Sequence, residues 1–170
     1  MRKSIFSGLN RQAVGHAART TVAATVSLAI AKMFRLPEAY WAVIITLVVT
    51  QSSLGAAWTI SSQRFVGTVL GAAAAVLLVN RMGSGMLTFA VGVFGLGLIC
   101  ALLRLDQAAY RFAGITLAIV VLVSRSQPPW IVASHRFFEV SLGIVTGLGM
   151  TALWPEREPT LPATAKGGGA

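Results

Sequence analysis

Two arginines at the beginning of apolar stretches are the residues of this sequence best suited to chemistry. Arg64 and Arg136 each follow a polar residue and each precede a phenylalanine and an apolar run. An arginine near the N-terminus of a helix adds a full charge to the positive end of the helix dipole and to its exposed N–H groups. Both side chains are therefore candidates for holding a carboxylate. In the alternative interpretation, the apolar part of each arginine side chain lies along the helix while its charged end reaches water at the membrane interface. Glu139 then simply pairs with Arg136.

A second group of polar side chains interrupts other apolar stretches. His16 and Arg19 lie three residues apart, so in a helix they share one face and could line an anion path or carry a proton. A structural hydrogen bond is the simpler role for His16. The Gln51-Ser52-Ser53 segment breaks an apolar run, and it either lines a cavity or forms an ordinary interfacial loop. The candidate substrate-binding residues are Arg64, Arg136, Arg19, His16, Thr46 and Ser52.

The composition places the elements that carry these residues in a lipid bilayer. Of the 170 residues, 55% are hydrophobic and 11% are charged, whereas about 25% of residues are charged in soluble domains. Such a chain cannot hide its apolar surface in one water-soluble core. The net charge of +9 comes from basic residues between the apolar runs, not from a stripe or cluster. We therefore expect these bases to flank membrane spans, and we expect no nucleic-acid partner.

The sequence carries no signature of an enzyme or of a cofactor site. It contains no G-x-S-x-G, no phosphate-binding loop and no H-E-x-x-H, and its five acidic residues are scattered. Cys100 is the single cysteine, which excludes an internal disulfide and a cysteine metal site. We therefore expect no catalytic residue, no cofactor and no bound metal.

The apolar runs predict six membrane-spanning helices joined by short loops. Tyr40 and Trp41 open the second run as an aromatic pair typical of the membrane interface. Residues 1–12 are predicted to form a basic interfacial segment without a cleaved targeting signal, and residues 155–170 have the composition of a disordered tail. The six predicted spans cover about residues 13–33, 39–50, 61–79, 86–103, 108–123 and 130–154.

The same order of features occurs twice, at an offset of 69 to 72 residues. Apolar sequences align easily by chance, but four matches in one order favour a duplication. Each copy holds three spans, an odd number, so the second copy must insert in the opposite orientation. The predicted fold is an all-α membrane protein of six transmembrane helices in two inverted three-helix repeats, about residues 13–80 and 84–154. The matches are Arg35-Leu36 with Arg104-Leu105, Ile45-Thr46-Leu47 with Ile115-Thr116-Leu117, Gln63-Arg64-Phe65 with His135-Arg136-Phe137, and Gly71 with Gly143.

Glycines at helical spacing mark predicted helix contacts. Gly67 and Gly71 lie four residues apart in the third span, and Gly143 and Gly147 lie four apart in the sixth. Small residues at this spacing let two helix backbones approach closely, either within one subunit or across a dimer. The basic residues show a modest bias to one side of the six spans, which favours a cytoplasmic N-terminus.

The first half of the chain resembles the membrane block of the fusaric acid resistance protein-like (FUSC) family. This family is related to aromatic acid exporters and, more distantly, to plant aluminium-activated malate channels. The resemblance covers about forty residues strictly, and the six-span plan extends it to about 150. The matching pattern is Tyr40-Trp41, Thr46, Gln51-Ser52-Ser53-Leu54-Gly55, and Arg64 with Gly67-Thr68 and Gly71.

The resemblance implies a six-helix integral membrane unit, residues 13–154, that moves small organic anions, aromatic acids among them, by efflux across the inner (plasma) membrane. Larger members of the family carry two membrane blocks or a soluble domain, whereas this sequence has one block. A homodimer or a paired membrane unit would restore the pair. The rival interpretation is a non-transporting membrane subunit that assembles with a partner transporter.

Overall fold

The described part of the chain is helical apart from its turns, which confirms the predicted all-α class for these residues. The computed structural model describes residues 11–50, 53–123 and 127–154. The predicted end segments, residues 1–12 and 155–170, therefore lie outside it except for the first two residues of the first helix. The described elements are α1 (Arg11–Met33), α2 (Tyr40–Thr50), α3 (Leu54–Met82), α4 (Met86–Leu102), α5 (Gln107–Ala118), the π-helical turn Ile119–Val123 and α6 (Pro129–Leu153).

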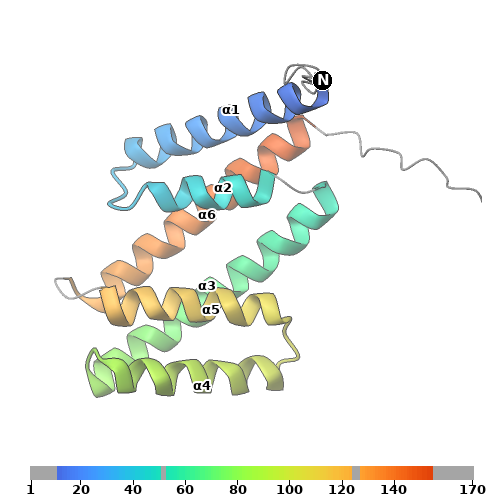
Figure 1. Ribbon diagram of the computed structural model, residues 1–170. Helices are drawn as coiled ribbons and strands as arrows, with labels where there is room; N and C mark the ends of the chain where they lie inside the picture. The colour runs from blue at the N-terminus through green and yellow to red at the C-terminus, as the bar shows by residue number, and fades with distance from the viewer. Residues whose placement is uncertain (1–10, 51–52, 124–126, 155–170) are drawn as a thin grey trace, which may run out of the picture.

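Two helix pairs lie on opposite sides of the molecule, and two long helices cross obliquely between them. Figure 1 shows α1 beside α2 along one side and α4 beside α5 along the other, with α3 and α6 running diagonally between the pairs. The most extensive contacts join helices from different halves of the chain: α3 packs on α5, α2 packs on α6, and α3 packs on α6. The centre of the molecule is therefore built from both halves together.

The outward faces of the helices are apolar. Phe94 in α4 is 70% exposed and Val145 in α6 is 67% exposed, which suits contact with lipid chains and not with water. By length and composition, two of the described helices, α3 and α6, qualify as candidate membrane spans. Three shorter apolar helical segments are Tyr40–Thr50, Met86–Leu102 and Gln107–Val123. Each predicted span thus corresponds to a helix, and two of these helices have the length and apolarity of a span.

The third helix begins earlier than the sequence predicts. We expected a separate short segment over residues 54–60 and a span from Ser61, but α3 is continuous from Leu54 to Met82, with Ser53 as its N-cap residue. No proline interrupts these residues, so the helix continues through Ser61 and Ser62. Arg64 consequently lies about three turns inside α3 and not near its start. Because a helix dipole acts within the first turn, the dipole argument for Arg64 is wrong.

Two turns with the same geometry precede α2 and α5. Arg35 and Arg104 both have a φ of 52°, and each lies just after the end of its helix. The next residue in each turn donates its backbone N–H five residues back, from Leu36 to Ala31 O at 3.0 Å and from Leu105 to Cys100 O at 2.9 Å. This is a Schellman termination with arginine in the left-handed position that glycine usually takes. The two loops matched in the sequence therefore share one conformation.

The last turn of the fifth span is π-helical. Residues Ile119–Val123 follow α5 without a break but widen into a π turn, with Val120 and Val121 buried. Nothing in the sequence distinguishes this apolar stretch from an ordinary helix. π turns occur frequently at functional sites, and this one places Ile119 and Val123 beside a cavity between α6 and the link before α2.

Candidate functional site

The crossing of α3 and α6 brings the two candidate arginines into the interior of the molecule. Phe65 and Phe137, the residues that follow them, stack with ring centroids 5.4 Å apart. The guanidinium groups are close enough for their charges to repel, although Arg64 is only 8% exposed and Arg136 only 4%. Two buried positive charges thus lie near each other where α3 and α6 cross.

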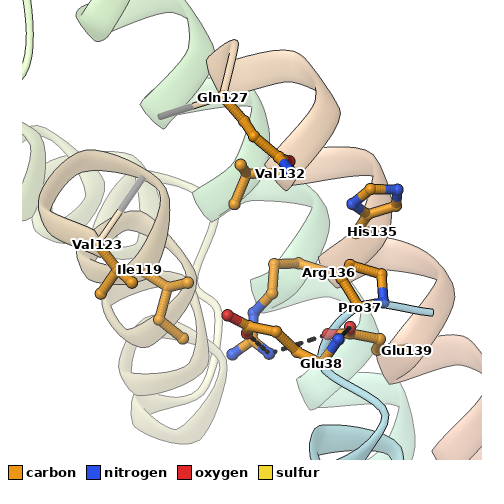
Figure 2. Close-up of a pocket in the computed structure, with 9 residues that line it drawn as sticks. All are labelled: Pro37, Glu38, Ile119, Val123, Gln127, Val132, His135, Arg136 and Glu139. Carbon is orange, nitrogen blue, oxygen red and sulfur yellow. Dashed lines mark hydrogen bonds and ion pairs between the residues drawn. The ribbon is translucent and has the colours of Figure 1, made fainter. Parts of the chain in front are cut away.

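Arg136 is balanced by two carboxylates and an aromatic ring. Its Nη1 lies 3.1 Å from Oε2 of Glu139 and 3.8 Å from Oε2 of Glu38, and its guanidinium carbon lies 4.0 Å above the ring of Trp41. Glu139 is fully buried, and its Oε1 accepts a hydrogen bond of 3.1 Å from the backbone N–H of Glu38. The carboxylate of Glu139 therefore ties α6 to the link that precedes α2 (Figure 2).

Arg64 occupies the matching position in α3 without a carboxylate. Its guanidinium carbon lies 4.7 Å from the centroid of the Phe112 ring. Among the described residues it makes no hydrogen bond and no ion pair, and its Nε is buried without a partner. Glu139 comes three residues after Arg136, whereas Gly67 comes three residues after Arg64. The counter-charge present in α6 is therefore missing from α3.

A cavity of about 190 Å³ lies beside the Arg136 group. Figure 2 shows the carboxylates of Glu38 and Glu139 converging on the guanidinium, with His135 nearby on the same helix. The cavity is large enough for several water molecules. It is lined by Pro37, Glu38, Ile119, Val123, Gln127, Val132, His135, Arg136 and Glu139.

Arg19 lies at a different place and has a different chemical role. It is 1% exposed, and its guanidinium donates to the backbone oxygens of Thr50 and Trp154, the latter at 2.8 Å. Thr50 is the last residue of α2, and Trp154 directly follows α6. Arg19 thus binds carbonyls at two helix C-termini, where a positive charge is favourable. His16, half-buried, lies one turn earlier on α1.

Of the two remaining candidates, one lies at a contact between two helices and the other lies outside the described residues. The Thr46 hydroxyl is buried and lies 2.9 Å from Ala42 O in its own helix and 3.3 Å from Gly143 O in α6. It therefore bonds to backbone between two packed helices and does not join the arginines. Ser52 lies outside the described residues.

Replacing Thr46 with valine tests this local role. Valine keeps the shape of the side chain but loses the hydrogen bonds, so we expect a loss of about 1 kcal/mol of stability. Thermal unfolding in detergent measures the change, and Thr59→Val, at an exposed hydroxyl that bonds to its own helix, is the matched control. Equal unfolding temperatures of the two variants and the wild type would contradict the hydrogen bond between α2 and α6.

Each of the four predicted packing glycines lies against another helix of the same chain. A Cβ at Gly67 or Gly71 would collide with the backbone of α5 at Ala109 or Ala113. A Cβ at Gly143 or Gly147 would collide with residues of α2. The close contacts that these glycines permit are therefore made inside one subunit, between α3 and α5 and between α6 and α2.

Three residues of the site were not anticipated from the sequence. Trp41 and Phe112 cover the guanidinium groups, although Trp41 looks like an interface residue and Phe112 like an ordinary apolar one. Glu38 lies far from Arg136 along the chain, so its position gave no signal of the ion pair. The spacing of three between Arg136 and Glu139 was the signal available for the ion pair, and no comparable signal marks the rings.

Comparisons with known proteins agree with the pattern of residues described above. The sequence matches the model of the family described as fusaric acid resistance protein-like over residues 23–150. It is 31% identical over 149 residues to the "Uncharacterized transporter YdhK" of Escherichia coli strain K12, covering 82% of this chain and 22% of that protein. The protein of the same name from Salmonella typhimurium is 30% identical over 150 residues, with the same coverage. The chain thus spans about a fifth of the length of these relatives, and no solved structure matches it.

Proposed function

We propose, since this chain belongs to the fusaric acid resistance protein-like family, that it is a membrane transporter or channel for small organic anions. The similar proteins of Escherichia coli and Salmonella typhimurium carry the name of transporters, which supports this class. The observation that carries the proposal is the buried guanidinium of Arg64, which has no carboxylate partner among the described residues.

An uncompensated charge inside an apolar helix assembly is costly, so it attracts an anion strongly. Burial of an unpaired ion costs several kcal/mol, and charged side chains within membrane helices commonly mark ion or substrate pathways. An incoming carboxylate would neutralise the charge of Arg64, as Glu139 neutralises the charge of Arg136. The ring of Phe112 lies beside this guanidinium and would offer apolar contact to an aromatic acid. We therefore include aromatic carboxylates among the proposed substrates.

We further propose that the six helices form two inverted three-helix repeats. The equal φ of Arg35 and Arg104 and the shared termination of α1 and α4 support this. The helix contacts follow the same pattern, because α3 packs on α5 as α6 packs on α2. Transporters with inverted repeats carry their substrate near the interface of the two repeats, where Arg64 and Arg136 meet.

We also propose a cytoplasmic N-terminus, which the modest bias of basic residues favours. An inner-membrane location, a homodimer and outward movement of the substrate are proposed from the resemblance to the family. A second candidate is a non-transporting membrane subunit that assembles with a partner transporter. Purified protein reconstituted alone distinguishes the two, because a subunit that needs a partner gives no flux by itself.

Removal of the Arg64 guanidinium tests the proposed function. We expect uptake of labelled hydroxybenzoate into proteoliposomes to fall about 10- to 100-fold in Arg64→Ala, because a charged hydrogen bond worth about 1.5–3 kcal/mol is lost. Arg81→Ala is the matched control, since Arg81 is an exposed arginine near the end of the same helix.

Equal protein content and equal size-exclusion profiles of the three preparations separate a transport effect from misfolding. Wild-type flux in Arg64→Ala would contradict the assignment of Arg64. Absence of flux in the wild-type protein, with several anions and with an imposed proton gradient, would favour the subunit interpretation.

A further inference from the structure

The Arg136 group contains carboxylates, unlike the Arg64 site. Its guanidinium faces Glu139 and Glu38, and the guanidinium of Arg64 lies close enough to act on Arg136. Glu139 is 0% exposed, while the side chain of Glu38 is 34% exposed. A fully buried carboxylate keeps its charge only while a positive partner stays beside it, and it takes a proton when that partner turns to another anion.

The geometry offers a binding atom for such a proton, Glu139 Oε2, and a route to that atom through the adjoining cavity. Glu139 Oε2 is bonded to Arg136 Nη1, and Oε1 is bonded to the backbone N–H of Glu38. A cavity of about 190 Å³ borders these groups, so water could bring a proton to Oε2. Protonation at Oε2 would remove the ion pair with Arg136 while the bond from the backbone of Glu38 to Oε1 remains.

We propose that Glu139 binds a proton each time the protein binds its organic anion. This inference rests on the proposed function. The proton comes from the bulk solution by way of water in the cavity and neutralises the Glu139 carboxylate. The guanidinium of Arg136 loses that partner and donates its N–H to the substrate carboxylate. The protein gains one positive charge and the anion brings one negative charge, so the net charge at the arginines does not change.

The division of roles follows from the sequence difference between α3 and α6. Glu139 and Gly67 each follow their arginine by three residues, but Gly67 lies against the backbone of Ala109, where a carboxylate cannot fit. The guanidinium of Arg64 is therefore always available to the anion. The guanidinium of Arg136 becomes available only when protonation of Glu139 breaks their ion pair. The charged groups that lie beside Glu139 are Arg136 on its own helix and Glu38 in the link before α2, and His135 lines the same cavity. Across the crossing, Arg64 on α3 acts on Arg136.

Proton uptake on anion binding is the decisive measurement. Purified protein in weakly buffered detergent solution is mixed with hydroxybenzoate in the presence of a pH-sensitive dye, and bound anion is measured in the same sample by equilibrium dialysis. We expect about one proton to be taken up per anion bound by the wild-type protein, and none by Glu139→Gln. Glutamine keeps an oxygen for the N–H of Glu38, so folding should be retained. Asp106→Asn, which changes the exposed carboxylate at the start of α5, should behave as wild type.

Other results would separate this inference from the proposed function. Anion binding without proton uptake by the wild-type protein overturns the proton site and leaves the anion site standing. Equal proton uptake by Glu139→Gln, with its loss in His135→Gln, assigns the proton to His135 and overturns the role of Glu139. If no anion binds to the wild-type protein, the proposed function fails. Infrared difference spectra between acid and neutral pH then still test whether Glu139 takes a proton, because its carboxylic acid band must vanish in Glu139→Gln.

Discussion

Replacing Gly71 with leucine is expected to prevent the chain from reaching a stable fold. The Cβ of any larger residue would lie 2.9 Å from the Cα and carbonyl carbon of Ala113 and closer still to its oxygen. These are backbone atoms of α5, which cannot move aside as a flexible side chain does. The α3–α5 contact is among the most extensive in the molecule, so we expect a loss of at least about 3 kcal/mol.

Thermal unfolding and size-exclusion chromatography in detergent measure this effect. Gly149→Leu is the matched control, because a Cβ at Gly149 in α6 meets no atom within 4 Å. The control should yield monodisperse protein that melts close to wild type, whereas Gly71→Leu should yield little or none. Similar melting of the two variants would show that α3 and α5 do not pack as described.

Replacing Arg19 with methionine is expected to have the second largest effect on stability. Methionine keeps an apolar stem but removes the donors to the carbonyls of Thr50 and Trp154. Those oxygens lie at helix ends, where no further turn supplies an N–H. Each charged hydrogen bond contributes about 1.5–3 kcal/mol, so we expect a loss of roughly 3 kcal/mol or more. Arg19→Lys should recover only part of it, because one ammonium group lacks the planar fork that serves two acceptors at once.

The measurement is the unfolding temperature in detergent, with Lys32→Met as the matched control at an exposed position near the end of α1. Flux measured on the same preparations separates the two roles considered for Arg19. Unchanged stability with lost flux would place Arg19 on the anion path and would contradict its role in joining the C-termini of α2 and α6.

Much of the helical plan could be predicted because membrane helices have a characteristic apolar composition. Long apolar runs, an aromatic pair and loops such as Arg104-Leu105-Asp106 located most helix ends to within a few residues. The start of α3 was wrong because Gln51-Ser52-Ser53 and the two serines at 61 and 62 suggested two boundaries, while only the first one is used. The family was identified correctly from the pattern around Arg64 and Gly71.

The partners of the polar side chains were less accessible to sequence reasoning. Arg19 binds carbonyls that lie 31 and 135 residues away along the chain. Every residue has a backbone carbonyl, so the sequence does not indicate which ones Arg19 binds. The same holds for Phe112, whose ring meets Arg64 through the packing of α3 on α5. The ion pair of Arg136 with Glu139 was foreseen because it is made within one helix, at a spacing of three.

Helices of the first half pack mainly on helices of the second half, so the packing of the first half cannot be completed before the second half has been synthesised. During synthesis α2 is complete long before α6, its main partner, and α3 must wait for α5. The first three helices alone therefore leave Gly67 and Gly71 without the α5 backbone that they pack against in the finished molecule. Packing of the first half is completed only when α5 and α6 have been made.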